Sequence, residues 1–167
     1  INETELLDQN SPLNDLLVSL KQNYKKAPYY KEVIGIVSQL NEEKHRSISG
    51  LSIKSIVLIS NYLKIKTKFQ LSSTSHSESK ALSKSDRLVA INKKCGTNDY
   101  INAIGGLNLY NKTEFKKEGI NLNFIESELK PYVQFENESI IGLSILDVLM
   151  FNSKEEIIKM IKNYKLI

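Results

Sequence analysis

The sequence predicts an α/β fold with a small, mainly parallel sheet and flanking helices, helix-rich at both ends of the chain. Two observations lead to this prediction. Apolar residues at helical spacing fill both end regions. Between them, short apolar runs typical of strands alternate with helical segments, which favours parallel strands joined by right-handed crossovers. With 167 residues, we expect a single domain over residues 1–167, complete or as a fragment of a longer protein.

The amino-terminal part is expected to be helical. Ser11-Pro12 has the form of a helix start, a serine N-cap followed by a proline in the first turn. Helical spacing of apolar residues then continues to Tyr24, and Pro28 ends this helix because the residue before a proline avoids the α region. A second helix follows, and the polar residues 41–50 are expected to form a loop before a third helix that begins at Ser52.

Short strands are expected in the middle of the chain. Lys66–Leu71 alternates in the way that strands do, and Tyr100–Ile104 and Leu122–Ile125 are short apolar runs. Tyr132–Phe135 is a further candidate strand. The serine-rich residues 72–84, after the first of these strands, are expected to form a loop.

More helices are expected between and after these strands. One covers about Ser85–Cys95 and ends at Gly96 in the C-cap position. A short helix is expected within Asn111–Lys117. Two more follow Gly142, and the capping box Ser153–Glu156 begins the last of them.

The composition predicts a cytoplasmic protein without a membrane-inserted segment. No apolar run approaches the roughly 20 residues that cross a bilayer, and Ile1–Asn10 is polar, unlike a secretory signal. Cys95 is the only cysteine, which excludes an internal disulfide and fits a reducing compartment. Cys95, His45 and His76 are too few for a zinc site with nitrogen and sulfur ligands, so no metal is expected.

The net charge of +4 is mild, but the basic residues are unevenly distributed. Eight of them lie between Lys64 and Lys94, against two acidic residues. This stretch could attract a phosphate-bearing ligand, or its lysines could simply coat a solvated face. Because the chain lacks an arginine-rich patch and the aromatic motifs of RNA-binding modules, nucleic acid is not an expected partner.

Several short motifs occur in a particular order along the chain. Tyr24–Tyr30 has the pattern Tyr-Lys-x-Ala-Pro-aromatic, Asn102–Tyr110 has Asn-x-x-Gly-Gly-x-x-x-Tyr, and Leu143–Asp147 reads Leu-Ser-Ile-Leu-Asp. Together and in this order they resemble the WbqC-like family. The resemblance spans roughly Tyr24–Ile167. Family members normally begin with a further segment that nothing in this chain matches, so the resemblance covers the carboxy-terminal two-thirds of the family.

The resemblance implies a role in the synthesis of bacterial surface polysaccharide, the O-antigen or capsule. The expected function is N-acyl or aminoacyl transfer to a nucleotide-linked amino sugar, which would make the protein a transferase acting on sugar nucleotides. The alternative is a non-catalytic binding or scaffold domain of the same pathway. The expected partner is a nucleotide sugar or an amino sugar. Neither a cofactor nor an oligomeric state follows from the sequence, and a homo-oligomer stays open.

Two residues are candidate catalytic groups. Asp147 lies in an apolar helix, where a carboxylate is costly to bury unless it is paired. It could act as a general base, or it could close a capping box with Ser144 or form a structural ion pair. Ser73 could form a nucleophilic pair with the nearby His76, or it could lie in a surface loop, since no Gly-x-Ser-x-Gly turn surrounds it. Cys95 is expected to be an inert buried thiol.

Six residues are candidate substrate contacts: Arg87, Asn102, Gly105, Gly106, Tyr110 and Gln134. Arg87 could bind a diphosphate bidentately, with an ion pair as the alternative. The two glycines could let backbone approach a ligand or form a plain turn. The other three polar side chains could orient sugar hydroxyls or bond the local backbone. We expect these residues to meet along one edge of the sheet, beyond the carboxyl ends of its strands.

Overall fold

The structure is a computed structural model that describes residues 4–6, 11–42, 47–135 and 139–167. The chain divides into two compact units. Unit 1 comprises Ile1–Thr67 and Leu129–Lys162, and unit 2 comprises Lys68–Glu128 and Asn163–Ile167. The single domain expected from the length stays a prediction, and the two units are described in turn.

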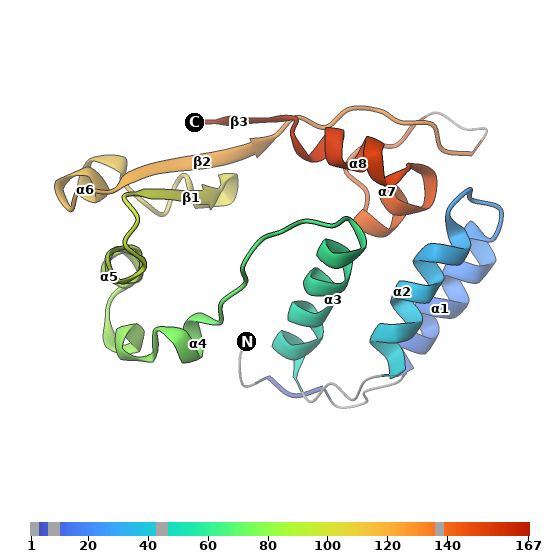
Figure 1. The fold of residues 1–167 in the computed structure, drawn as a ribbon, viewed down its shortest axis with the longest axis horizontal. Helices are drawn as coiled ribbons and strands as arrows, with labels where there is room; N and C mark the ends of the chain where they lie inside the picture. The colour runs from blue at the N-terminus through green and yellow to red at the C-terminus, as the bar shows by residue number, and fades with distance from the viewer. Residues whose placement is uncertain (1–3, 7–10, 43–46, 136–138) are drawn as a thin grey trace. The chain divides into compact units, whose positions relative to one another are not determined.

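Unit 1 is helical in its described residues (Figure 1). Its helices are α1 (Ser11–Tyr24), α2 (Tyr30–Glu42), α3 (Ile48–Tyr62), α7 (Ile145–Phe151) and α8 (Lys154–Ile161). The sequence predicted a helix in each of these places. Apolar spacing and capping signals coincide there, which is why the predictions succeeded.

The core of unit 1 joins helices that are far apart in the sequence. Val33 of α2 and Leu149 and Met150 of α7 are fully buried, and Ile157 of α8 is nearly so. Burying an aliphatic side chain of this size contributes about 1.5–3 kcal/mol. The Tyr29 N–H also donates to the Met150 carbonyl oxygen at 3.1 Å. The start of α7, where Asp147 lies, is therefore fixed against the amino-terminal helices.

The loop expected over residues 41–50 is shorter than predicted. Helix α2 continues through Glu42, and residues 43–46 lie outside the described part of the chain. Helix α3 begins at Ile48 rather than at Ser52, because the Ser47 hydroxyl accepts the Gly50 N–H at 3.2 Å and so caps an earlier turn.

Unit 2 combines short helices with a sheet (Figure 1). Its elements are α4 (Ser72–Ser75), the 3₁₀ helix η1 (Ser77–Ala81), α5 (Lys84–Cys95), β1 (Asp99–Ala103), the 3₁₀ helix η2 (Ile104–Gly106), α6 (Lys112–Lys117), β2 (Asn121–Ser127) and β3 (Tyr164–Leu166). The sheet has the order β1-β2-β3. Strands β1 and β2 are parallel, and β3 pairs antiparallel to β2. The predicted α/β fold with a mainly parallel sheet is confirmed.

The core of unit 2 lies around α6 and β2. Phe115, Ile120, Leu122 and Phe124 are each at most 4% exposed. Leu122 and Phe124 alternate with exposed or half-buried residues along β2, so one face of the strand is buried. The tyrosine rings of β1 and of the turn after it pack against this core.

Three local predictions are corrected. Lys66–Leu71 and Tyr132–Phe135 contain no strand, because alternation indicates an extended backbone but supplies no neighbouring strand for its hydrogen bonds. Residues 72–84, predicted as a loop, contain α4 and η1.

Among the helices of the described residues, none is long and apolar enough to cross a membrane.

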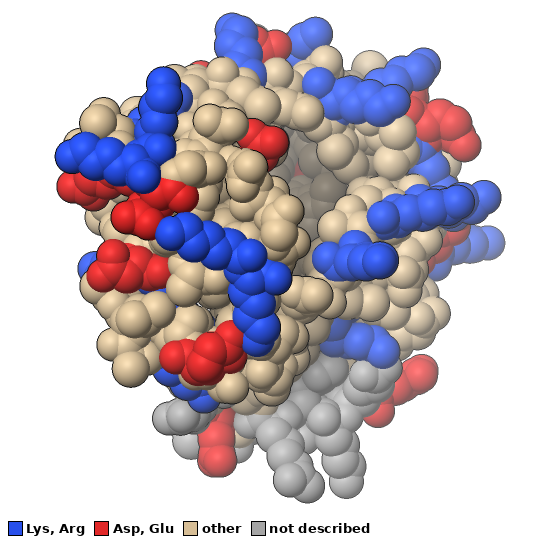
Figure 2. Space-filling model, turned by 60° about the vertical axis from the view of Figure 1, so that its left-hand side comes forward, with Lys and Arg blue, Asp and Glu red and all other residues tan. Residues whose placement is uncertain are grey.

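Basic and acidic side chains are interspersed on the face of the molecule in Figure 2. Within the basic stretch Lys64–Lys94, Lys93 pairs with Glu118 at 2.7 Å and Lys94 pairs with Glu78 at 2.6 Å. All four side chains are about half exposed, and such surface pairs contribute about 0–1 kcal/mol. Part of the stretch is therefore neutralised locally and does not form a purely positive surface.

Candidate functional site

Asp147 is a buried carboxylate of unit 1, with 5% of its surface exposed. It lies in the first turn of α7, where a negative charge is favoured by the helix dipole. The Ser144 hydroxyl caps this helix by accepting the Leu146 N–H at 3.3 Å. The Asp147 side chain turns away from this cap toward two tyrosines.

Three side chains donate hydrogen bonds to the Asp147 carboxylate. The Tyr24 hydroxyl donates to Oδ2 at 2.7 Å, and the Tyr132 hydroxyl donates to Oδ1 at 2.5 Å. The Gln134 amide also donates to Oδ1, at 2.9 Å. The structure thus brings together Asp147 and Gln134, two residues selected from the sequence, and adds two tyrosines. Such donors to an ionised acceptor offset the cost of burying the charge.

Both tyrosines keep their protons at neutral pH. Burial raises the pKa of Tyr24 to about 12, and the hydrogen bond to Asp147 and its negative charge act in the same direction. Burial is also the largest cause for Tyr132, whose pKa is raised to about 12, again with the help of Asp147 and with Gln134 opposing. The two phenols are therefore hydrogen-bond donors here and not bases.

Gln134 is held by the local backbone as well as by Asp147. Its amide donates to the Ile140 carbonyl oxygen at 3.0 Å, and its own carbonyl oxygen accepts the Ile140 N–H at 2.8 Å. An open pocket of about 380 Å³ runs along residues 131–135 and Ser139, but Asp147 is not among its lining residues. Sugar binding by Gln134 stays a prediction, and the contacts observed are those of its local alternative.

Arg87 of unit 2 contacts hydroxyl groups. Its Nε donates to the Ser79 hydroxyl at 3.3 Å, and its Nη2 donates to the Ser72 hydroxyl at 3.2 Å. The neighbouring Asp86 carboxylate instead accepts the Ser83 hydroxyl at 2.6 Å. No carboxylate in the described part of the chain pairs with Arg87. The half-buried guanidinium therefore keeps donors for an anionic ligand.

The other predicted contacts of unit 2 lie near the end of β1: Asn102 is in the strand, Gly105 and Gly106 are in η2, and Tyr110 follows. An added Cβ at Gly106 would lie 3.0 Å from the Asn102 side-chain amide, which would have to move slightly to make room for it. A Cβ at Gly105 would meet nothing within 4 Å. The Tyr110 ring packs edge-on against Phe115, with ring centroids 6.0 Å apart. The role of these residues in substrate binding stays a prediction.

Ser73 has no hydrogen bond to His76 among the described residues. It is half-buried in α4, whereas the His76 ring is 5% exposed and directs Nε2 toward Gln70 and Cys95. The expectation that Cys95 is buried is wrong, because this thiol is exposed at the end of α5. The catalytic role of Ser73 stays a prediction, for which the described residues show no base.

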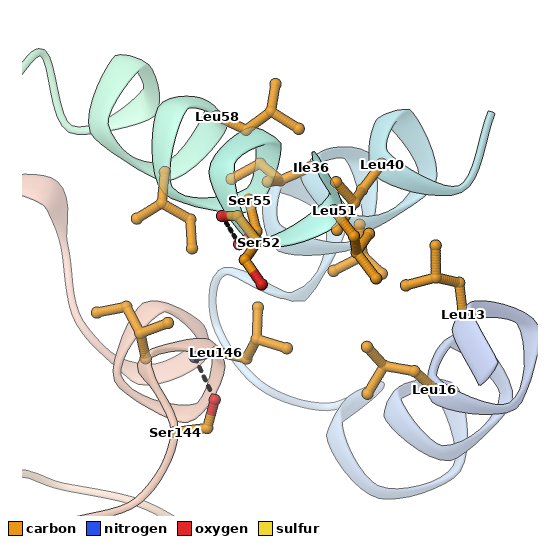
Figure 3. A pocket seen from close by; sticks show the side chains of 13 residues that line it. Leu13, Leu16, Ile36, Leu40, Leu51, Ser52, Ser55, Leu58, Ser144 and Leu146 are labelled. Atoms are coloured by element: carbon orange, nitrogen blue, oxygen red, sulfur yellow. Dashed lines mark hydrogen bonds between the residues drawn. The ribbon is translucent and has the colours of Figure 1, made fainter. Parts of the chain in front are cut away.

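Unit 1 also contains an apolar pocket of about 340 Å³ (Figure 3). Aliphatic side chains of α1, α2, α3 and the start of α7 line it, together with Ser52, Ser55 and Ser144. The Ser55 hydroxyl donates to the Ser52 carbonyl oxygen, and the Ser144 hydroxyl is engaged in its helix cap. With no charged group in its lining, this pocket does not suit a nucleotide diphosphate.

The comparison with protein families gives one match. The model of the WbqC-like protein family matches residues 1–159, nearly the whole chain. The chain belongs to the WbqC-like protein family. Neither the curated proteins nor the solved structures include a significant match.

The family match confirms the resemblance and extends it. It begins at residue 1, ahead of Tyr24, where the motifs of this WbqC-like chain were first recognised. It ends before β3 (Tyr164–Leu166). The three motifs that indicated the family all lie within the matched residues, and two of them supply Tyr24 and Asp147, which are in contact.

Sequence reasoning missed the tyrosines around Asp147 in this WbqC-like protein. Tyr24 lies in the first recognised motif but was interpreted as a core residue, and its contact with Asp147 spans 123 positions. Tyr132 was placed in a strand. The six residues expected along one sheet edge fall into two units, with Gln134 in unit 1 and the others in unit 2. No group of three or more His, Cys, Asp or Glu side chains in the described ranges could hold a metal ion.

Proposed function

We propose that this WbqC-like protein takes part in the synthesis of bacterial surface polysaccharide, O-antigen or capsule, and binds a nucleotide-linked amino sugar there. Family membership supports the pathway, through what the resemblance implies. The proposed ligand class rests on one observation. The Arg87 guanidinium donates to hydroxyl groups and has no carboxylate partner among the described residues.

The surroundings of Arg87 suit a diphosphate. The Ser72 hydroxyl accepts a bond from Arg87, which leaves its own hydrogen free to donate to a phosphate oxygen. Lys80 and Lys84 are exposed on the same stretch of chain. A planar guanidinium can bind two phosphate oxygens at once, which a lysine cannot reproduce. The diphosphate of a sugar nucleotide is therefore the ligand that this group supports best.

The proposed reaction is N-acyl or aminoacyl transfer to the amino group of the sugar. Such a transfer needs a group that accepts the proton of the attacking amine. Asp147 remains the proposed base from the sequence. It would have to exchange one of its present donors for the substrate amine, because Tyr24, Tyr132 and Gln134 already occupy its oxygens.

The three hydrogen bonds to the Asp147 carboxylate also favour the alternative function, a non-catalytic binding or scaffold domain of the pathway. A carboxylate that is 5% exposed and bonded by three donors fits a structural role. The two functions differ in whether product forms, and not in whether the ligand binds.

Binding can be tested by thermal shift with UDP-, dTDP- and GDP-linked amino sugars. We expect one nucleotide class to raise the melting temperature of the wild type. Arg87→Ala should weaken the apparent affinity by about tenfold or more, because a charged hydrogen-bonding partner is lost, and Arg87→Lys should restore it only in part. The control Lys116→Ala removes an exposed positive charge from α6 and should bind normally. The absence of any shift in the wild type would contradict the proposal.

Turnover separates the two functions. The protein is incubated with the nucleotide-linked amino sugar that binds and with acyl-thioester or aminoacyl donors, and the sugar is analysed by mass spectrometry. A product that carries the new amide supports transfer. Binding without any product supports the scaffold alternative.

A further inference from the structure

Unit 2 contains a thiol next to an imidazole. The Sγ atom of Cys95, at the end of α5, lies 3.8 Å from Nε2 of His76. The same Nε2 atom lies 3.4 Å from Oε1 of Gln70. Cys95 is exposed, whereas His76 is 5% exposed. A thiol that solvent can reach therefore faces a ring that the fold holds in place.

The second ring nitrogen of this imidazole is a further unusual feature of the site. The Nδ1 atom of His76 is buried without a hydrogen-bond partner in the described part of the chain. Buried polar atoms normally have partners, because an unpaired one destabilises the folded state. The polar contacts of the ring are concentrated at Nε2, the atom that faces Cys95 and Gln70.

We propose that Cys95 is a nucleophile, that His76 accepts its proton, and that the pair takes acyl groups from an acyl thioester. The inference deepens the proposed function and rests on it for the final acceptor, the amino sugar. A nucleophile beside a base that a third group orients is the arrangement that activates cysteine. Gln70 is the group that approaches the ring here, because its side-chain amide lies 3.4 Å from Nε2 beside the thiol.

The neighbouring charges show why the imidazole is needed. Cys95 ends α5, and the carboxyl end of a helix disfavours a thiolate. Lys94 is adjacent, but its ammonium pairs with Glu78 at 2.6 Å and donates to the Ser75 carbonyl oxygen at 2.9 Å. The reactivity of the thiol therefore depends on His76.

The transfer balances in two steps. First, the Cys95 proton moves to Nε2 of His76 while Sγ bonds to the acyl carbon; the carbon–sulfur bond of the donor breaks, and the departing thiolate takes that proton. Second, the amino group of the sugar attacks the new thioester, a carbon–nitrogen bond forms and the bond to Sγ breaks. One amine proton passes through His76 to the thiolate, so that in this route His76 takes the place of Asp147 as the base. The products are an amide and a thiol, and no oxidant or reductant is consumed.

The first experiment measures the reactivity of Cys95, which is the only thiol in the chain. Alkylation by iodoacetamide at about pH 7, where an ordinary thiol is only a few per cent ionised, is followed by intact-protein mass spectrometry on native protein and on protein unfolded in urea. We expect the native protein to react at least about tenfold faster, within the usual range for a positioned base. An equal or slower native rate overturns the proposal, since unfolding removes the base and improves access.

Two variants separate the imidazole from general disturbance. His76→Asn should slow native alkylation by about tenfold or more, whereas Ser77→Ala changes an exposed neighbour and should leave the rate unchanged. Circular dichroism verifies that each variant folds. If His76→Asn does not fold, the comparison of native and unfolded wild type decides alone. An unchanged rate in folded His76→Asn overturns the proposal.

The second experiment tests the acyl donor, with acetyl-coenzyme A and S-acetyl-N-acetylcysteamine as probes. We expect one acetyl group on Cys95, removable by hydroxylamine and absent from Cys95→Ala. No acetyl group on Cys95 from either probe overturns the proposal. Neither experiment contains a sugar nucleotide, so its failure leaves the binding test of Arg87 standing, and a failed binding test leaves these results standing.

Discussion

A single carboxylate, Asp147, connects segments that are distant in the chain. Tyr24 closes α1, while Tyr132 and Gln134 precede α7, and all three donate to the same group. Hydrogen bonds to an ionised acceptor are roughly twice as strong as neutral ones. We therefore expect Asp147 to stabilise unit 1 whether or not it also takes part in catalysis.

Removing one donor should measure this contribution. Tyr132→Phe keeps the ring and deletes the hydroxyl that donates to Asp147. The free energy of unfolding should fall by about 1.5–3 kcal/mol, the usual range for a hydrogen bond to a charged group, as measured by urea unfolding. Tyr30→Phe is the control, because the Tyr30 hydroxyl makes no hydrogen bond to another described residue, and it should cost less than about 0.5 kcal/mol. Equal costs would show that the bond to Asp147 contributes nothing.

The same tyrosines predict a loss of stability in alkali. In the unfolded chain a tyrosine ionises near pH 10, whereas the pKa of Tyr24 and of Tyr132 is raised to about 12 in the fold. The folded state therefore holds these protons more tightly. Its added stability is complete below pH 10 and is lost as the pH rises through about 12. Ultraviolet titration should show phenols that ionise above the exposed ones, and Tyr132→Phe should remove one. Titration of every tyrosine near pH 10 would contradict this.

Among the elements, α8 has the most complete amino-terminal cap. The Ser153 hydroxyl accepts the Glu156 N–H at 3.2 Å, and the Glu156 carboxylate accepts the Ser153 N–H at 2.8 Å. These bonds lower the pKa of Glu156, with the backbone bond to Ser153 as the largest cause. The sequence predicted this capping box, since its residue types and spacing suffice to recognise it.

Loss of the cap should destabilise unit 1. Ser153→Ala is expected to lower the free energy of unfolding by about 1 kcal/mol, measured by urea unfolding at neutral pH. Because the pKa of Glu156 is lowered in the fold, its contribution is present above the unfolded value of 4.5 and fades in acid. The Ser153 side chain also helps to lower this pKa, so part of the cost of Ser153→Ala should disappear at low pH. Ser52→Ala, an exposed serine within α3, should have little effect at either pH.

Two of the strands could be predicted from the sequence, but the pairing between strands could not. Residues of β1 and β2 were predicted because apolar runs between polar residues and glycines indicate them. The strand β3 has three residues, too few to show a period of two. Lys66–Leu71 has that period and yet pairs with no strand, because a pattern within one segment does not name its partner. The same reason hid the contact between Tyr24 and Asp147, which depends on tertiary packing.

At the scale of the whole molecule, the chain passes three times between its units. It leaves unit 1 after Thr67, returns at Leu129, and contributes Asn163–Ile167 to unit 2. Strand β3, within that last segment, is the one that pairs with the second edge of β2. The sheet of unit 2 thus depends on residues that follow the last helix of unit 1 in the sequence.

Deleting residues 163–167 should expose one edge of β2 and spare the other. The Phe124 N–H donates to the Ile167 carbonyl oxygen at 2.9 Å, so its hydrogen exchange should accelerate in the truncated protein. The Asn121 N–H donates to the Asn98 carbonyl oxygen at 2.7 Å and serves as an internal control that should stay protected. Hydrogen exchange measured by NMR compares the two amides. Equal acceleration of both would mean that β1 and β2 do not pair stably without β3.

The interrupted path of unit 1 also matters while the protein is being made. Helices α1 to α3 leave the ribosome before Leu149, Met150 and Ile157, which complete their core, because residues 68–128 are translated in between. Nascent chains with uncovered apolar surface are prone to aggregate. The early helices are therefore expected to engage chaperones until translation has supplied α7 and α8.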